Sequence, residues 1–347
     1  MKNILIVSYH FYPDINPRSF RALDLAKEFV NQGHSVTVFT KHKTEVDNIK
    51  VLYPTKRSRF LDTLLKVKTL SFAYDVYANL SKKDKYDMVL SVGLPISCHI
   101  GTFLYKKFKN KNNNLTLIAD YGDPYYTKFS GIKQTILKNL EKFILKEFDY
   151  LTIPIENAKP VYTKISNGNK IKVIPQGINY KDIKIDKYTK NNVITFSYAG
   201  LFYKDIRNPT VLLDYLVKLN IDFRFIIYTS FNHLDNMEIL EKYQDILKEK
   251  LIINPIIPRE ECIYELSKAD FLIYQNNSVQ VQKSSKIIDY MITRRPYFEF
   301  DQNNFDNEEF DSFLSSNNSD MTVKYKEELE KYSIDKIANS FLELING

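Results

Sequence analysis

Short apolar segments alternate with longer segments of helical periodicity from the start of the chain. The apolar runs are rich in Val, Ile and Leu and occupy 3–9, 34–41, 88–92, 115–121, 150–155 and 171–176. Between them, apolar residues recur at helical spacing over 18–32, 95–108 and 133–148. Near-continuous apolar strands joined by helices are typical of a parallel sheet that is covered on both faces. The pattern therefore predicts an α/β domain.

The same alternation restarts after a polar, lysine-rich stretch at 181–192. Predicted strands then occupy 193–200, 223–229, 251–257, 271–276 and 296–300, and predicted helices occupy 208–219, 259–269 and a segment that begins near 285. We expect two doubly wound, Rossmann-like domains over 1–182 and 190–325. A last predicted helix around 326–345 could pack on either domain, and the N-terminal domain is the expected partner of 326–347.

Composition indicates an ordinary globular protein with reduced thiols. The 347 residues suffice for two hydrophobic cores, and 44% hydrophobic and 26% charged residues are usual values. No apolar run approaches the ~18 residues that a membrane-spanning helix needs, and the first run is too short for a signal peptide. Cys98 and Cys262 are the two cysteines, far apart in sequence. This favours reduced thiols in the cytoplasm, and it argues against a disulfide framework and against a cysteine-rich metal site.

Charge is distributed unevenly along the chain. Residues 1–180 hold 28 Lys and Arg against 15 Asp and Glu, a net +13, whereas residues 181–347 hold 21 against 27, a net −6. The segment 54–72 mixes five Lys and Arg with leucines and phenylalanines, as a basic amphipathic helix on an anionic membrane does. The alternative is an ordinary domain helix with a solvated basic face. We expect no nucleic acid partner, because no zinc-finger, RNP or basic-zipper signature is present.

Polar side chains cluster where predicted strands end, which is where ligands bind in open α/β sheets. His10, Asp14, Arg18 and Arg21 follow the first strand, Asp120 and Asp123 follow the fourth, and Lys204 and Arg207 follow the first strand of the second domain. The turn after the first strand contains no glycine, which argues against a nicotinamide oxidoreductase. The sequence contains no GxxxxGK[ST] loop, which argues against a kinase or an ATPase.

The segment KSSKIIDYMITRRP (283–296) combines hydroxyls, a cation and one carboxylate at the start of a predicted helix. Ser284 and Ser285 suit the N-cap, and Lys286 then lies in the first turn, where the helix dipole favours anions. A cation there opposes the dipole unless an anion lies between them. The alternative is a capped surface helix with an i,i+3 pair of Lys286 and Asp289.

The order of these segments resembles the GT-B glycosyltransferases, specifically the retaining family-4 type that builds bacterial capsule and lipopolysaccharide. The resemblance covers nearly the whole chain. It is carried by PxxxPRSFRALDLAKEFVNQGHSVTVFT (13–40), DYGDP (120–124), KVIPQGIN (172–179), YAGLFYKDIRNP (198–209) and SSKIIDYMITRRP (284–296). The resemblance implies a GT-B fold, in which two Rossmann-like domains face each other across a cleft.

The resemblance also implies the donor site. Lys286 and Arg207, with Lys204, Ser284 and Ser285, are similar to the groups that hold the diphosphate of a UDP- or GDP-sugar. Asp289 occupies the place of the second acid of the family's E-x7-E motif, which binds the ribose hydroxyls. Ile257, Pro258 and Arg259 fall where the base packs.

The acceptor side follows from the same resemblance. The implied reaction is transfer of a sugar to a lipid-linked glycan acceptor with retention at the anomeric carbon, at the inner face of the cytoplasmic membrane. We expect no metal and no tightly bound cofactor. The candidate catalytic residues are Asp120 and Asp123, together with Arg207 and Lys286 as electrostatic stabilisers of the leaving diphosphate. The candidate acceptor-binding residues are His10, Asp14, Arg18 and Arg21. The alternative for Asp120 and Asp123 is a structural aspartate that caps the next loop. The alternative for Arg18 and Arg21 is a solvated basic helix face.

The chain departs from the family pattern in four places, one of which is the absence of the paired glycines after the first strand. Val281 stands where the first acid of E-x7-E is expected, Leu201 replaces an arginine, and Arg294 replaces a glycine. Two alternatives therefore stay open. One is a catalytically silent GT-B partner subunit, and the other is a nucleotide-sugar epimerase or hydrolase on the same fold.

Overall fold

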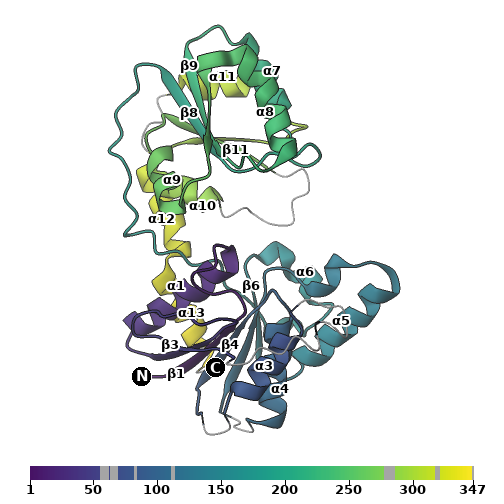
Figure 1. The fold of residues 1–347 in the computed structure, drawn as a ribbon. Helices are drawn as coiled ribbons and strands as arrows, with labels where there is room; N and C mark the ends of the chain where they lie inside the picture. Colours follow the sequence, from purple (N-terminus) through teal and green to yellow (C-terminus); the bar gives the residue numbers. More distant parts are fainter. Residues whose placement is uncertain are drawn as a thin grey trace. The chain divides into compact units, whose positions relative to one another are not determined.

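The computed structural model describes residues 1–54, 62, 69–81, 84–110, 114–276, 286–316 and 321–345. The chain divides into two compact units, of which the first comprises Met1–Asn179 with Lys331–Gly347 and the second comprises Tyr180–Glu330. Each unit is built on a parallel sheet (Figure 1). No helix among the described residues has both the length and the apolar character needed to cross a membrane.

The first unit contains a seven-stranded sheet in the order β3-β2-β1-β4-β5-β6-β7. Its strands are β1 (Asn3–Ser8), β2 (Ser35–Phe39), β3 (Lys50–Leu52), β4 (Met88–Val92), β5 (Thr116–Asp120), β6 (Tyr150–Ile153) and β7 (Ile171–Val173). Its α-helices include α1 (Pro17–Asn31), α3 (Ser71–Asn79), α4 (Ser97–Phe108), α5 (Gly131–Leu145), α6 (Lys159–Tyr162) and α13 (Ile334–Glu343). Asn16 caps α1 by accepting hydrogen bonds from the N–H groups of Arg18 and Ser19.

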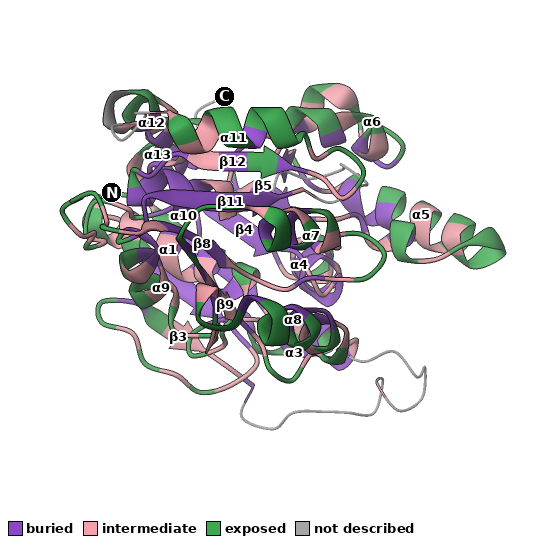
Figure 2. Ribbon diagram, turned by 90° about the horizontal axis from the view of Figure 1, so that it is seen from above, coloured by how far each residue is buried: buried purple, intermediate pink, exposed green. Residues whose placement is uncertain are grey.

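Helices cover both faces of this sheet, which explains the near-continuous apolar strands. Successive residues of β1 enter opposite cores: Ile4 and Ile6 pack with α1 and α13, whereas Leu5 and Val7 pack on the side of α3 and α4. The central strands of both sheets, such as β4, β8 and β11, are buried over most of their length (Figure 2). The predicted α/β class is confirmed by these two parallel sheets.

The end of the chain differs from the single helix predicted over 326–345. The structure has α12 (Thr322–Leu329), a short 3₁₀ turn over Glu330–Tyr332, and then α13. The interruption arises because the N–H of Ile178 donates to the carbonyl of Tyr332 (2.8 Å), and the N–H of Ile334 donates to the carbonyl of Ile178 (3.2 Å). These strand-like bonds take up backbone groups that a continuous helix would need.

The second unit contains a five-stranded sheet in the order β10-β9-β8-β11-β12. Its strands are β8 (Ile194–Ala199), β9 (Phe223–Thr229), β10 (Leu251–Pro255), β11 (Phe271–Gln275) and β12 (Tyr297–Phe300). Its α-helices include α7 (Thr210–Lys218), α8 (Leu234–Leu247), α9 (Arg259–Leu266), α10 (Lys286–Thr293), α11 (Asn307–Ser315) and α12. The strand order reverses between β8 and β11, and such a switch point opens a crevice for ligands at the carboxyl ends of the strands.

Candidate functional site

Tyr290 of α10 keeps β8 and β11 apart at this switch point. The two strands pair only at Phe271 with Phe196 and at Leu272 with Ser197. Beyond these pairs the Tyr290 hydroxyl accepts a hydrogen bond from the N–H of Ala199 (3.2 Å) and donates one to the carbonyl of Ile273 (3.0 Å). The side chain thereby satisfies backbone groups that the ladder leaves open, and it holds α10 beside the end of β8.

Lys286 is the first residue of α10 and lies against the end of β8. Its Nζ is 3.3 Å from the hydroxyl oxygen of Tyr198 and 4.7 Å from the centre of the Tyr198 ring. Gly200 makes this position possible, because a Cβ built on that residue would lie 1.8 Å from the Lys286 Nζ. Gly200 also has a φ of +142°, which other residues rarely adopt. The ammonium group therefore lies directly over the backbone at the strand end.

Arg207 brings a second cation to the same place. Mutual backbone hydrogen bonds between Tyr203 and Arg207 (3.1 and 3.2 Å) close the turn that carries it. Its Nη1 donates to the carbonyl of Leu201 (3.2 Å). Burial and then repulsion by Arg207 lower the pKa of Lys286 to about 7, and these effects outweigh the attraction of Asp289. An anion held between two such cations would relieve their repulsion, so the arrangement suits a phosphate or diphosphate.

Asp289 lies one turn further along α10 and is held by Arg259, the first residue of α9. Both the Nε (3.0 Å) and the Nη2 (2.5 Å) of Arg259 donate to Oδ1 of Asp289, so Oδ2 is not used by this pair. Arg259 was expected beside a nucleotide base, and sequence analysis missed its bond to Asp289. Ile257 and Pro258 precede it in the loop that follows β10.

The other predicted donor-site residues either lie away from Lys286 and Arg207 or fall outside the described residues. The exposed Lys204 pairs with Glu238 of α8 (2.7 Å) and lies 3.9 Å from Asp235 of the same helix. Ser284 and Ser285, the position of Val281, and most of the basic stretch 54–72 lie outside the described residues.

In the first unit, the structure places Asp120 and Arg21 in one buried ion pair. Arg21 donates from Nε and Nη2 to the two carboxylate oxygens (2.6 and 2.7 Å), and Thr152 donates to Oδ1 (2.7 Å). Asp120 is 0% exposed and Arg21 is 3% exposed. Arg21 also donates to the carbonyls of Ile174 and Pro175. The pair thus ties α1 to the ends of β5 and β7, and neither side chain reaches the surface.

Arg18 lies closer to the surface than this pair. Its Nη1 is 3.7 Å from Oδ2 of Asp120, and its side chain is 19% exposed. A Cβ on Gly122 would lie 1.3 Å from the Arg18 Nη2, so a side chain at this position would displace the guanidinium. Asp123 follows directly and attracts the same guanidinium. Arg18 and Asp123 are therefore the predicted charges that remain near the surface at this strand end.

His10 and Asp14 form a third cluster with Lys41, which the sequence analysis did not single out. The Nδ1 of His10 is 2.9 Å from Oδ2 of Asp14, and the Nζ of Lys41 donates to the same oxygen. Burial raises the pKa of Asp14, but hydrogen bonds from Lys41 and His10 outweigh it and the pKa falls. His10 also lines a pocket of about 260 Å³ with Leu94, Ser97 and Tyr125, beside the switch point between β1 and β4.

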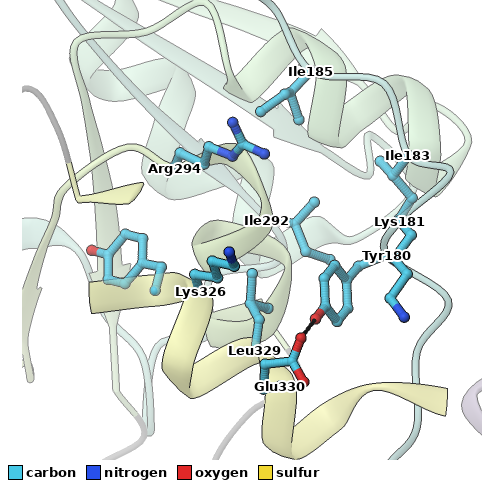
Figure 3. A pocket seen from close by; sticks show the side chains of 10 residues that line it. Tyr180, Lys181, Ile183, Ile185, Ile292, Arg294, Lys326, Leu329 and Glu330 are labelled. Atoms are coloured by element: carbon cyan, nitrogen blue, oxygen red, sulfur yellow. Dashed lines mark hydrogen bonds between the residues drawn. The ribbon is translucent and has the colours of Figure 1, made fainter. Parts of the chain in front are cut away.

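A separate pocket of about 330 Å³ lies in the second unit at the far end of α10 (Figure 3). Ile292 and Leu329 form part of its apolar wall, and the side chains of Arg294 and Lys326 approach it from two elements. Tyr180 donates a hydrogen bond to Glu330 at its edge (3.3 Å). None of the predicted site residues that the structure describes lines this pocket. Among the described residues, no group of three or more His, Cys, Asp or Glu is arranged to hold a metal ion.

Comparisons with known proteins relate the chain to glycosyltransferases by structure. Neither a protein-family profile nor a curated protein sequence matches it. A glycosyltransferase from Rickettsia africae is similar over 99% of this chain and 97% of its own, with a TM-score of 0.69 and 16% identity. Anabaena HepE in complex with UDP and glucose is similar over 100% of both chains, with a TM-score of 0.64 and 11% identity.

A third similar structure is the N-terminal domain of trehalose-6-phosphate phosphatase from Candida albicans. It matches 99% of this chain and 96% of that chain, with a TM-score of 0.72 and 11% identity. At these identities the likeness concerns the fold. Two parallel α/β sheets and whole-chain neighbours of this kind give the protein the GT-B fold of glycosyltransferases.

Proposed function

We propose that this protein is a glycosyltransferase that moves a sugar from a nucleoside diphosphate donor, UDP- or GDP-linked, to a glycan acceptor. The observation that carries the proposal is the pair of cations, Lys286 and Arg207, at the switch point of the second unit. A ribose can bind one helical turn away through Oδ2 of Asp289, because Arg259 occupies only Oδ1. The base then packs near Ile257 and Pro258. Ser284 and Ser285, which lie outside the described residues, are proposed to donate hydrogen bonds to the diphosphate.

The proposed chemistry retains the anomeric configuration and needs no metal. The bond between the anomeric carbon and the diphosphate oxygen breaks, and the acceptor oxygen forms its bond on the same face of the sugar. The acceptor proton passes to the departing phosphate oxygen. Lys286 and Arg207 stabilise the negative charge that develops on the diphosphate, which is electrostatic stabilisation by preorganised groups.

The acceptor is proposed to bind to the first unit. Arg18 contacts an anionic group of the acceptor, such as a lipid-linked pyrophosphate, and Asp123 orients its hydroxyl. His10 and Asp14 line the neighbouring surface. Asp120 and Arg21 act as positioning residues, since both are buried and Asp120 lies behind Arg18. The sequence resemblance supports a role in bacterial surface polysaccharide synthesis at the inner face of the cytoplasmic membrane.

A nucleotide panel tests the donor site before the acceptor is identified. UDP, GDP, CMP and their common sugars are titrated into the wild type and Lys286→Ala, with thermal shift and calorimetry as readouts. We expect one nucleoside diphosphate to stabilise the wild type and to bind the variant at least about tenfold more weakly. If no nucleotide binds at millimolar concentration, a catalytically silent partner subunit replaces the proposal. Product NMR and addition of EDTA then test retention and metal independence.

A further inference from the structure

Helix α5 of the first unit is largely exposed although it is rich in apolar residues. Its buried residues are Glu141, Ile144 and Leu145, all in its last turn and a half. Ile132 and Ile136 are 82% and 62% exposed, and Phe143 and Leu140 are 56% and 39% exposed. Figure 2 shows the helix extending outward from the unit with most of its ribbon coloured as exposed or intermediate. A soluble surface helix normally places such residues against the core.

The exposed apolar residues form one stripe. Their spacing of four, four and three residues places Ile132, Ile136, Leu140 and Phe143 on one side of a helix with 3.6 residues per turn. Ile144 and Leu145 pack into the core from the other side, with Leu137 beside them. Of these four, Phe143 also contacts the buried Phe103, with ring centroids 5.5 Å apart. Ile132, Ile136 and Leu140 therefore offer the apolar surface, and Ile132 and Ile136 in the N-terminal half of α5 are its most exposed residues.

Lysines flank this stripe, and the acid of the helix is turned away from it. Lys138, Lys142 and Lys146 recur every four residues along one edge, and the exposed Lys133 lies on the other edge. Glu141 is the single acidic residue of α5, and it is buried, where it accepts hydrogen bonds from the N–H groups of Tyr125 (3.0 Å) and Tyr126 (2.8 Å). The next acid, Glu147, pairs with Lys107 (2.7 Å). The exposed face is thus apolar and basic.

A polar hollow continues the basic edge. A pocket of about 360 Å³ is lined by Lys142, Lys146, Ser166 and Asn167, with Lys170 at its wall. Lys170 donates to the carbonyl of Phe148 (2.7 Å), just beyond the end of the helix. Two ammonium groups, a hydroxyl and an amide around one hollow can receive a phosphate group.

We propose that α5 docks the protein on an anionic phospholipid bilayer. The apolar stripe enters the boundary between headgroups and acyl chains, while the lysine column and the adjoining hollow contact lipid phosphates. A protein partner is disfavoured, because a basic rim without exposed acids matches an anionic lipid surface rather than the mixed charges of a protein surface. Docking through α5 would bring the first unit to a lipid-linked acceptor, and this purpose rests on the proposed function.

Co-sedimentation of the full chain with vesicles tests this surface. Vesicles of phosphatidylglycerol and phosphatidylcholine are compared with pure phosphatidylcholine, at low and high salt. We expect binding to the anionic vesicles, weakened by salt, and little binding to the neutral ones. Ile132→Ser with Ile136→Ser should lower partitioning by at least about tenfold. Lys142→Gln with Lys146→Gln should lower it about fivefold or more.

A matched control uses Leu234→Ser with Ile246→Ser on α8 of the second unit, where the side chains are 84% and 53% exposed. This pair removes as much exposed apolar surface and should leave vesicle binding unchanged. Unchanged thermal midpoints show that the variants are folded. The proposal is overturned if the α5 variants bind vesicles as the wild type does, or if the wild type does not bind anionic vesicles. It is also overturned if the stripe variants instead dissolve an oligomer.

Vesicle binding needs neither donor nor acceptor, so it is independent of the nucleotide panel. An α5 variant that loses vesicles but keeps its nucleotide affinity supports both proposals. A wild type that binds anionic vesicles but no nucleotide supports the docking surface and contradicts the proposed reaction.

Discussion

The low pKa of Lys286 predicts that donor affinity falls as the pH rises above 7. Burial and then Arg207 hold this pKa at about 7 in the free protein. A bound diphosphate favours the charged lysine and raises its pKa, so binding takes up a proton above pH 7. Because the lysine is half protonated at pH 7, affinity then falls about 50-fold between pH 7 and pH 9, and the slope approaches tenfold per pH unit at the upper end of this range. The terminal phosphate of UDP titrates near pH ~6, so its charge is constant over this range.

The same lysine affects the stability of the free protein with the opposite sign. Its pKa is lower in the folded state than the ordinary 10.5, so the unfolded state binds more protons between pH of about 7 and 10.5. The contribution of Lys286 to the free energy of unfolding therefore increases with pH in this window. A general loss of the fold at high pH would lower stability and affinity together, so thermal midpoints recorded at each pH separate the two causes.

Calorimetry at pH 7, 8 and 9 measures the affinity, and repeating it in buffers of different ionisation enthalpy measures the proton uptake. Lys286→Ala should bind the nucleotide weakly and with little change across this range, because the titrating group is gone. Lys286→Arg keeps a permanent charge and should also lose the pH dependence. A wild-type affinity that is constant from pH 7 to 9, or an equal decline in the alanine variant, would refute the reasoning.

Three further predictions concern single residues. Gly200→Ala should weaken nucleotide binding at least about tenfold in a calorimetric titration, because the added Cβ would lie 1.8 Å from the ammonium of Lys286. The control Gly168→Ala, whose Cβ would meet no atom within 4 Å, should bind the nucleotide as the wild type does. Asp120→Asn should lower the free energy of unfolding by about 3–5 kcal/mol in a urea titration, since it breaks a buried pair, while Lys159→Ala, in an exposed pair, should cost less than about 1 kcal/mol. Arg294→Gly should stabilise the protein by about 0.5–1 kcal/mol in thermal unfolding, because this arginine has a φ of +59°, and an unchanged or lower midpoint would contradict the strain argument.

The fold could be predicted from the sequence because strands that are buried on both faces are apolar almost without interruption. β1 shows this, since Ile4 to Val7 are all 0% exposed and alternate between two cores. The strand ends could be predicted for the same reason, and with them the neighbourhood of Arg207 and Lys286. The break between α12 and α13 could not, because it depends on hydrogen bonds to Ile178, which is far away in sequence.

Partners within the candidate site could not be predicted, because they are separated by many residues. Arg259 and Asp289 are 30 positions apart, and Arg21 and Asp120 are 99 positions apart. Both arginines were placed from local patterns at ligand-contacting positions, whereas the structure gives each a carboxylate of its own chain. A local pattern identifies a cation at a strand end, but it does not show whether a carboxylate elsewhere in the chain already neutralises that cation.

The two units differ in how far carboxylates of the chain neutralise the cation at the strand end. In each of them a basic side chain lies over a glycine just after a strand: Arg18 over Gly122, and Lys286 over Gly200. Burial lowers the pKa of both cations. The buried Asp120 offsets this cost for Arg18, which is attracted to it more strongly than it is repelled by Arg21. For Lys286 the neighbouring charge with the strongest effect on the pKa is a second cation, Arg207. The carboxylate of Asp289 has a weaker effect, and one of its oxygens accepts hydrogen bonds from Arg259. An incoming anion therefore gains more at Lys286 than at Arg18, which supports the proposal that the diphosphate binds to the second unit.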